Sequence, residues 1–365
     1  MAAIDDVVAV FAALGSAHDS APVVAAGLAG IGVANGATLL ARIAGADMYP
    51  PERTGRGIAL VLFGSVLGAI LGPLVFGPVL AGRDLDGGTL AQLWLASAAF
   101  ELVGLALVAA VRPDPKRIAA LMRYESVNSA RSGAPIGELI RRPGVVPALL
   151  AAQASFGVMV AVMTLTGSVV VDHFQQEDQA VFPIIAVHFV GMYALVIVVG
   201  DLVDRIGRTR SLSGGLLLMG VSVSCLPWVQ DAEPTAAALF GLGVGWNVSF
   251  IAATAELSAR SAPSERGSLL GFNDLVSAAT GAGLTLLGGL ALTYAGVPAL
   301  TIGAAALVVI PALWILRHGT SAVRDRSVGC HTRRSSTRAL FLRDAARARP
   351  EPSAVRLASD QPRSC

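Results

Sequence analysis

Long apolar segments alternate with short polar connections along most of the chain. Nine of them are long enough to cross a hydrocarbon core of about 30 Å as helices. They lie at 22–41, 57–81, 90–111, 145–171, 179–199, 212–228, 235–257, 271–292 and 298–316. A further apolar stretch, 7–17, is too short to span comfortably. The pattern predicts an all-α integral membrane protein with about nine or ten transmembrane helices.

The composition agrees with this pattern. The chain is 54% hydrophobic and 14% charged, with a mean hydropathy of +0.66, whereas soluble domains carry about 25% charged residues. The 40 glycines suit close helix packing in a membrane. The cysteines Cys225, Cys330 and Cys365 are far apart and indicate neither a disulfide framework nor a metal site. Residues 1–6 lack a basic group, so we predict no signal peptide.

Lysine and arginine gather on alternate connections. The connections 43–56, 112–143, 200–211 and 259–266 together hold fourteen of these residues, whereas the intervening set holds only Arg83. Connections rich in positive charge remain in the cytoplasm. We therefore expect a multi-pass protein of the cell (inner) membrane with both termini in the cytoplasm.

A polar stretch at 112–143 divides the chain, with three long spans before it and six after it. We expect a partial N-terminal helical bundle over 1–111, a cytoplasmic linker over 112–143 and a C-terminal six-helix bundle over 144–317. The remainder, 318–365, is rich in arginine, serine and proline. It is predicted to be a disordered basic cytoplasmic tail.

The two halves contain a repeated pattern. Gly30 and Gly32 lie in a span that leads to a charged loop at 52–57. In the same way, Gly241 and Gly243 lie in a span that leads to a charged loop at 264–267. Internal repeats are typical of secondary transporters. If the halves match, 7–17 is the remainder of a helix, and two further helices are absent from the N-terminus.

The connection 200–210 is the most densely charged part of the apolar region, and its charges are expected at a membrane surface. Its small and charged positions are Gly200, Asp204, Arg205, Gly207 and Arg208. We expect a turn here, with Asp204 pairing with the arginines to clasp two helix ends. The alternative is a polar loop that only sets orientation.

This spacing resembles the loop signature of major facilitator superfamily transporters, although Thr209 stands where the family usually has a basic residue. The resemblance covers roughly 7–317 and aligns it with helices three to twelve. It implies two bundles that rock around a central cavity, with the charged motif as a cytoplasmic latch.

Two further segments bear on the resemblance. Residues 68–77 partly resemble the fifth-helix antiporter signature, with Phe76 in place of a glycine; a packing ridge of small residues is the alternative. The fourth-helix pattern aligns at 26–32, where Ala26 and Ala29 replace its arginine and glutamine. Drug–proton antiporters often carry that arginine, so its absence argues against multidrug efflux.

Two ionisable side chains lie in the middle of predicted spans, where burial is costly and marks function. Glu101 lies within 90–111 and His188 within 179–199. Both can exchange protons, which makes them candidates for proton coupling. The alternative is a neutral side chain hydrogen-bonded between helices.

The resemblance places the substrate cavity between helices one, four, seven and ten. The candidate cavity residues are Asn35, Thr38, Gln153, Thr164, Thr166, Trp246 and Asn247. An aromatic ring beside amides can hold an organic substrate by stacking and hydrogen bonds. Hydrogen bonding between helices is the alternative.

Charged residues near the cytoplasmic ends form a second candidate group. We expect a gate network that contains Glu256, Arg260, Arg266, Asn273 and Asp274. Arg42, at the end of the span 22–41, is expected to snorkel toward the membrane surface.

The sequence shows no nucleophile–base pair, no glycine-rich phosphate loop and no metal-ligand spacing, so we expect no enzyme activity, cofactor or metal. We predict a secondary active transporter of a small organic molecule, working by alternating access and coupled to protons, as in antiporters. Its partners are lipid, substrate and protons, without nucleic acid. The alternatives are a transport-incompetent remnant and a membrane-embedded enzyme or assembly factor.

Overall fold

The computed structural model describes residues 10, 12–18, 20–27, 41–80, 86–112, 133–175, 181–229 and 231–347. Contacts divide the chain into two units, Met1–Leu316 and Arg317–Cys365. The secondary structure of the described residues is helical, with no strand among them. The all-α prediction is therefore confirmed.

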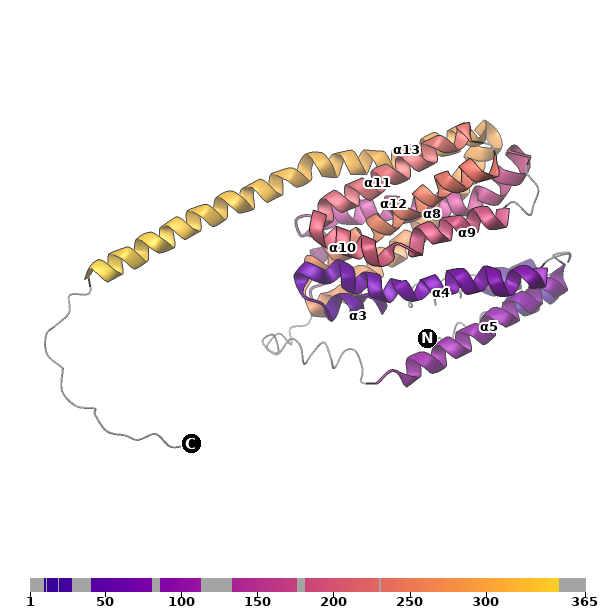
Figure 1. Ribbon diagram of the computed structural model, residues 1–365, viewed down its shortest axis with the longest axis horizontal. Helices are drawn as coiled ribbons and strands as arrows, with labels where there is room; N and C mark the ends of the chain where they lie inside the picture. Colours follow the sequence, from indigo (N-terminus) through magenta and orange to yellow (C-terminus); the bar gives the residue numbers. More distant parts are fainter. Residues whose placement is uncertain are drawn as a thin grey trace. The chain divides into compact units, whose positions relative to one another are not determined.

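Figure 1 labels α3, α4 and α5 in the part of the chain before the linker. The bounds of the elements there are α3 (Ala41–Asp47), the 3-10 helix η1 (Pro51–Arg53), α4 (Thr54–Leu80) and α5 (Gly87–Ala110). Asp86 caps α5, because its Oδ1 accepts a hydrogen bond from the N–H of Thr89 at 2.7 Å, which lowers the pKa of Asp86. Most of the predicted span 22–41 lies outside the described residues.

The C-terminal half begins with a short helix and continues through longer ones (Figure 1). Its elements are α7 (Ile136–Arg141), α8 (Val145–Ser168), the π-turn η2 (Val169–His173), α9 (Val181–Tyr193), α10 (Val196–Ile206), α11 (Arg208–Cys225), the 3-10 turn η4 (Leu226–Trp228), α12 (Ala232–Ala259) and α13 (Pro263–Arg347).

Helix α13 contains both of the last two predicted spans. Gly296 interrupts it with φ 73° and ψ −174°, a conformation that glycine adopts without strain. The spans 271–292 and 298–316 lie on either side of this kink. In the second unit the residues as far as Arg347 are helical, and the disordered basic tail expected over 318–365 stays a prediction. Alanine and arginine in that stretch favour a helix.

Five of the described helices are long and apolar enough to cross a membrane, or six if α9 and α10 form one bent span. Only 6% of the apolar window of α5 is buried in the protein, against 61% for α8. An apolar helix with so little protein around it is expected to face lipid. The structure thus supports the predicted multi-pass arrangement.

The predicted continuous span 179–199 is broken in the structure. Helix α9 ends at Tyr193, α10 begins at Val196, and the two are bent by 42°. Ala194 still donates to the carbonyl of Val190, and the carbonyl of Leu195 accepts from the N–H of Val199, both at 2.9 Å, so these two residues end one helix and begin the next. No proline or glycine occupies these two positions, so the sequence gives no local signal for the break.

The charged motif also differs from the predicted turn over 200–210. Gly200 to Ile206 form the last two turns of α10, and α11 starts at Arg208. Only Gly207, with φ 97°, leaves the helical conformation. One glycine is therefore enough to reverse the chain, and Asp204 projects from a helix rather than from a loop.

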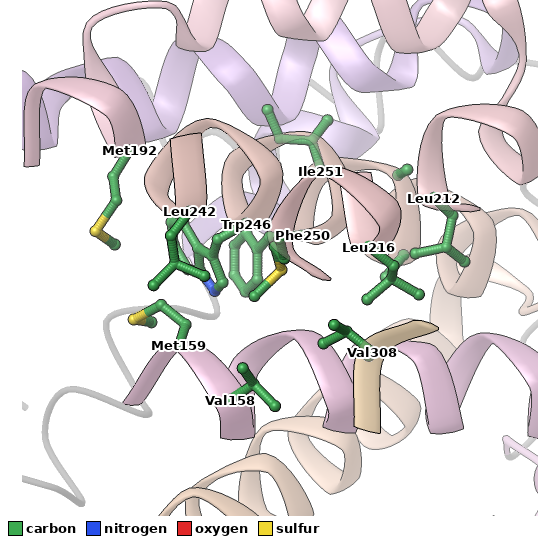
Figure 2. Packing of buried hydrophobic residues seen from close by; sticks show 14 of the residues in the cluster. Val158, Met159, Met192, Leu212, Leu216, Leu242, Trp246, Phe250, Ile251 and Val308 are labelled. Carbon is green, nitrogen blue, oxygen red and sulfur yellow. The ribbon is translucent and has the colours of Figure 1, made fainter. Parts of the chain in front are cut away.

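Helix α12 is the centre of the core. It packs most extensively against α11 and α9 and also against α8. Close approach to α11 requires glycine, because a Cβ on Gly245 would lie 2.8 Å from the carbonyl oxygen of Gly215. Figure 2 shows Trp246 and Phe250 of α12 among the buried side chains of this core.

Candidate functional site

Asp204 joins the C-terminal half to the first turn of α4. Its Oδ1 accepts a hydrogen bond from the N–H of Gly55 and its Oδ2 from the N–H of Arg56, both at 2.9 Å. These N–H groups have no acceptor within their own helix and carry the positive end of its dipole. The carboxylate of Asp204 therefore caps α4, and we call this contact the latch.

The latch connects different helices from those expected. The sequence suggested that Asp204 pairs with Arg205 and Arg208 between α10 and α11, but its hydrogen bonds go to α4. The reason is close packing, because a Cβ on Gly200 would lie 2.5 Å from the Cβ of Ala59. The charged motif thus lies between the two halves of the protein.

Arg42 forms a second contact between the halves, and its predicted snorkelling is wrong. The side chain is 1% exposed, and its Nη2 lies 2.6 Å from Oδ1 of Asp274, which is 8% exposed. Its Nε donates to Oγ1 of Thr254 at 3.3 Å, and its guanidinium lies 5.0 Å from the ring centre of Phe250. Arg42 lies in the first turn of α3 and points into the protein instead of toward the membrane surface.

A polar network extends from this ion pair. Nδ2 of Asn273 donates to Oδ1 of Asp274 at 3.1 Å, and Nε2 of Gln153 donates to Oδ1 of Asn273 at 3.1 Å. Oδ2 of Asp274 is buried and has no hydrogen-bond partner among the described residues. Gln153, predicted to line the cavity, therefore belongs to the surroundings of Asp274.

A third contact between the halves joins the end of α3 to the start of α13. Nη1 of Arg266, in the first turn of α13, pairs with Oδ1 of Asp47 at the end of α3. We call Arg42–Asp274 and Asp47–Arg266 together the gate. Both pairs lie near the ends that charge distribution predicts to be cytoplasmic.

The gate partners differ from the expected network. Asp274 pairs with Arg42, and Arg266 with Asp47, whereas Arg260 binds Glu256 one turn earlier on α12 at 2.7 Å. Arg260 also donates to the carbonyl of Pro143. The sequence identified most of the charged residues but not their pairing.

The end of the linker is tied to α13 by another ion pair. Arg142 makes two hydrogen bonds to Glu265, at 2.6 and 2.9 Å. This bonding raises the pKa of Arg142. The pair anchors the start of α8 to the start of α13 within the C-terminal half.

His188 lies inside the C-terminal half, fully buried between α9 and α12. Its Nδ1 is 2.7 Å from the carbonyl oxygen of Leu239, and its Nε2 has no hydrogen-bond partner in the part of the chain that the structure describes. Because a carbonyl only accepts, the Nδ1 carries the hydrogen. Glu101 is half-buried on α5, apart from the gate residues in sequence. The hydrogen bond of His188 to Leu239 matches the alternative to proton coupling, a neutral side chain hydrogen-bonded between helices.

Aromatic rings on α12 continue inward from Arg42. Phe250 stacks on Trp246 with ring centres 4.8 Å apart, and Trp246 meets Tyr193 edge to face at 6.2 Å. Asn247 is 1% exposed. Within the described ranges, its Oδ1 and Nδ2 and the Nε1 of Trp246 have no hydrogen-bond partner. This group, Tyr193, Trp246, Asn247 and Phe250, is called the aromatic–amide cluster.

The remaining cavity candidates lie elsewhere. Thr164 is exposed, and Asn35 and Thr38 are outside the described residues. Thr166 donates to the carbonyl of Val162 at 2.8 Å and lines a space of about 20 Å³ with other threonines and apolar side chains. Such a space holds about one water molecule, too little for an organic substrate.

The described segments contain no group of three or more His, Cys, Asp or Glu side chains that could hold a metal ion. The chemistry of the described site therefore consists of charge pairing, hydrogen bonding and aromatic contact.

Sequence reasoning missed several residues of this site. It did not anticipate the burial of Arg42, the pairing of Asp47, or the aromatic roles of Phe250 and Tyr193. The available signal for Arg42 was its position at the edge of an apolar run. If such an arginine is buried, it requires a carboxylate partner. Its partner lies 232 positions away, and only the folded chain identifies it.

The fold and the paired charges define a multi-pass membrane protein with two halves that meet in a polar gate. The Major Facilitator Superfamily profile matches residues 172–345. A transporter of that type from Bacillus subtilis, the uncharacterized YdeG, is 30% identical over 290 residues, covering 77% of this chain and 67% of the relative. The chain therefore belongs to the major facilitator superfamily, a family of transporters.

A second relative has a named substrate. The riboflavin transporter RfnT of Brucella anthropi is 29% identical over 285 residues, which cover 76% of this chain and 68% of RfnT.

Solved structures show the same fold. The human organic anion transporter MFSD10 aligns with a TM-score of 0.58 at 17% identity, covering 86% of this chain and 82% of MFSD10. The proton:xylose symporter XylE aligns with a TM-score of 0.59 at 13% identity, covering 86% of this chain and 78% of XylE. At these identities the likeness concerns the fold alone.

Proposed function

We propose that this protein is a secondary active transporter that carries a small planar organic molecule across the cell (inner) membrane. Substrate movement occurs by alternating access and is exchanged against protons. The observation that carries this proposal is the gate, in which two ion pairs join the halves near their cytoplasmic ends. A gate made of charge pairs can be closed in one state and opened in another.

The aromatic–amide cluster suggests the substrate class. Stacked rings bind flat molecules, and an amide with two unused atoms can donate one hydrogen bond and accept another. A planar heteroaromatic ring offers both features. Similarity to RfnT makes riboflavin the first substrate to test.

The latch and the gate act together in this proposal. Asp204 holds α4 to α10, while Arg42 and Asp47 hold α3 to α13. In this proposal both contacts close the side predicted to be cytoplasmic, and they must break for that side to open. Arg205 and Arg208 contribute positive charge at the same membrane surface.

Transport assays on the purified full chain test the proposal. Proteoliposomes are loaded with radiolabelled riboflavin, and its movement is followed with an inside-acid gradient, an outside-acid gradient or no gradient. We expect saturable movement, fastest when protons run opposite to riboflavin. Equal riboflavin movement in protein-free liposomes would contradict riboflavin as a substrate. Faster movement when protons run in the same direction as riboflavin would contradict exchange against protons.

A further inference from the structure

The break between α9 and α10 lies close to the middle of a membrane span. The two helices run from Val181 to Ile206 and together form one bent span, with Ala194 and Leu195 near its centre. Both of these residues are exposed. Irregular backbone at this depth is tolerated only where it is buried in protein or lines a water-filled cavity, because hydrocarbon offers no hydrogen-bond partner. An exposed break of this kind is therefore expected to face a cavity rather than lipid.

Backbone groups on both sides of the break lack the partners that a continuous helix would give them. In such a helix the carbonyls of 191–194 would accept hydrogen bonds from the N–H groups of 195–198. Among the described residues, the structure shows only the flanking bonds from Ala194 to Val190 and from Val199 to Leu195. The end of α9 thus presents carbonyl acceptors, and the start of α10 presents N–H donors.

The end of α9 lies against the aromatic–amide cluster. Helices α9 and α12 approach closely, because a Cβ on Gly243 would lie 3.0 Å from the backbone nitrogen of Met192. Figure 2 shows Met192 in the same buried group as Leu242 and Trp246. The next residue, Tyr193, ends α9, and its ring meets that of Trp246 at 6.2 Å. Trp246 is 3% exposed, and its Nε1 has no hydrogen-bond partner in the described segments.

Resting on the proposed function, we propose that the break binds the hydrogen-bonding edge of the substrate while the neighbouring aromatic rings hold its face. The ligand that fits is a flat heteroaromatic ring with an imide edge, in which a carbonyl, an N–H and a second carbonyl stand in a row. The N–H of this edge donates to a carbonyl at the end of α9, and its carbonyls accept from N–H groups at the start of α10. The flavin ring of riboflavin has such an edge.

The two helix ends also explain which molecules fit poorly. A purely apolar ring leaves the backbone donors and acceptors without partners, which costs binding free energy. A carboxylate is attracted by the positive dipole end of α10 but repelled by the negative dipole end of α9. A neutral ring that carries donors and acceptors on one edge satisfies both ends. The break therefore selects for hydrogen-bonding pattern, and the aromatic rings select for a flat shape.

A matched pair of proline substitutions tests the break itself, because proline removes a backbone N–H. Both positions are buried valines, Val196 being 0% and Val199 5% exposed. Val196→Pro changes the first residue of α10, where proline is tolerated, whereas Val199→Pro removes the N–H that donates to Leu195. Thermal unfolding should therefore be near normal for Val196→Pro and occur at a clearly lower temperature for Val199→Pro. Equal destabilisation would overturn the break.

The Val196→Pro variant also removes one proposed donor to the ligand. Lumiflavin, which has the flavin ring with a methyl group in place of the long side chain, is the probe. Its binding to the full chain is followed by flavin fluorescence. Loss of one hydrogen bond should weaken this binding about tenfold. Unchanged lumiflavin affinity in Val196→Pro would overturn the role of that N–H group.

Hydrogen exchange on the unsubstituted full chain in nanodiscs tests the inference without any variant. The amides of 195–198 should exchange much faster than those of 184–193 and 199–204, because they have no helical acceptor and face water. Lumiflavin should slow this exchange. Its analogue methylated on the imide nitrogen should have little effect, since it has no N–H to donate.

Each other result of the exchange experiment counts against the proposal. Exchange at 195–198 as slow as in the rest of α9 and α10 would overturn the break as a site. Fast exchange that lumiflavin leaves unchanged, or equal protection by lumiflavin and its methylated analogue, would overturn binding of an imide edge. Because transport is not measured, absence of riboflavin transport would count only against the proposed function.

Discussion

At the residue scale, three acidic side chains hold the two halves together in different ways. Asp274 neutralises a buried arginine, Asp47 pairs with Arg266, and Asp204 caps a helix. The first contact is an ion pair in a low-dielectric environment, where losing one partner is costly. The last combines hydrogen bonds with the dipole of α4. Charge loss at each position therefore has its own expected consequence.

Asp204→Asn should slow transport while leaving membrane insertion intact. Asparagine keeps one acceptor but loses the charge and one of two hydrogen bonds to α4. A charge-assisted hydrogen bond contributes about 1.5–3 kcal/mol, so the initial rate should fall by about tenfold or more. Initial uptake rates normalised to membrane expression measure the effect.

The matched control for the latch is Asp201→Asn. Asp201 lies 3.5 Å from Arg56 on a surface where the two side chains are 34% and 45% exposed. Exposed pairs of this kind contribute little. Near-normal transport is expected, and an equal loss in both variants would remove the special role of Asp204.

Asn247→Leu separates stability from transport. Both amide atoms of Asn247 are buried and have no hydrogen-bond partner among the residues that the structure describes. An apolar side chain of similar shape should therefore leave the unfolding temperature unchanged or raise it. One hydrogen bond to the substrate contributes about 1–1.5 kcal/mol of binding free energy, so its loss should raise KM by about tenfold. Thermal unfolding in detergent and riboflavin uptake give the two values.

A lower unfolding temperature in this variant would indicate a structural role for the amide. Ser249→Ala is a control on the same helix, because Ser249 hydrogen-bonds within the bundle to Ser155 and to its own helix. It should lower stability without changing KM.

At the scale of elements, a long apolar run was sufficient to predict α4, α5, α8, α11 and α12, because crossing a bilayer requires such a run. Breaks inside apolar runs were harder. Gly296, followed by Pro298, matches a predicted boundary between two spans. The break between α9 and α10 follows no such residue, since Ala194 and Leu195 are ordinary helix formers. Both α9 and α10 pack against α12 and α4, and these contacts cannot be read from the local sequence at the break.

Gly200→Ala tests the close contact of α10 with α4. A new Cβ would lie 2.5 Å from the Cβ of Ala59 and 2.9 Å from the carbonyl oxygen of Gly55. Overpacking of this kind costs about 1–3 kcal/mol. Thermal unfolding should occur at lower temperature, and the latch should weaken with it.

Gly214→Ala is the control for that substitution. Gly214 is also helical, but a Cβ there meets nothing within 4 Å. Alanine should be neutral or stabilise the helix by up to about 1 kcal/mol. Similar destabilisation by both substitutions would argue against the packing explanation.

At the scale of the whole molecule, the repeated pattern and the polar stretch 112–143 predicted two halves on either side of a linker. The chain belongs to a family of transporters, and the boundaries of the two halves stay a prediction. The partners across the interface were not predictable, because Arg42 and Asp274 are 232 positions apart and neither position specifies the other. Tertiary pairing, rather than local pattern, determines which charges form the gate.

The predicted orientation can be checked with reporter fusions. Alkaline phosphatase, which is active only outside the cytoplasm, should be inactive when fused after Arg142 or Gly207 and active when fused after Asp86 or Asp231. The physical reason is the arginine content of the first two connections. Phosphatase activity in only one of the two fusions after Arg142 and Gly207 would contradict the span assignment.

Alternating access through the gate is tested most directly by locking it. Asp47→Cys and Arg266→Cys are introduced together in a cysteine-free chain and bridged with a short bis-methanethiosulfonate reagent, and riboflavin uptake into proteoliposomes is measured before and after reduction. We predict that the bridged protein binds riboflavin but does not transport it, and that reduction restores transport. Undiminished uptake by the fully bridged protein would contradict opening of this gate as a step in the cycle.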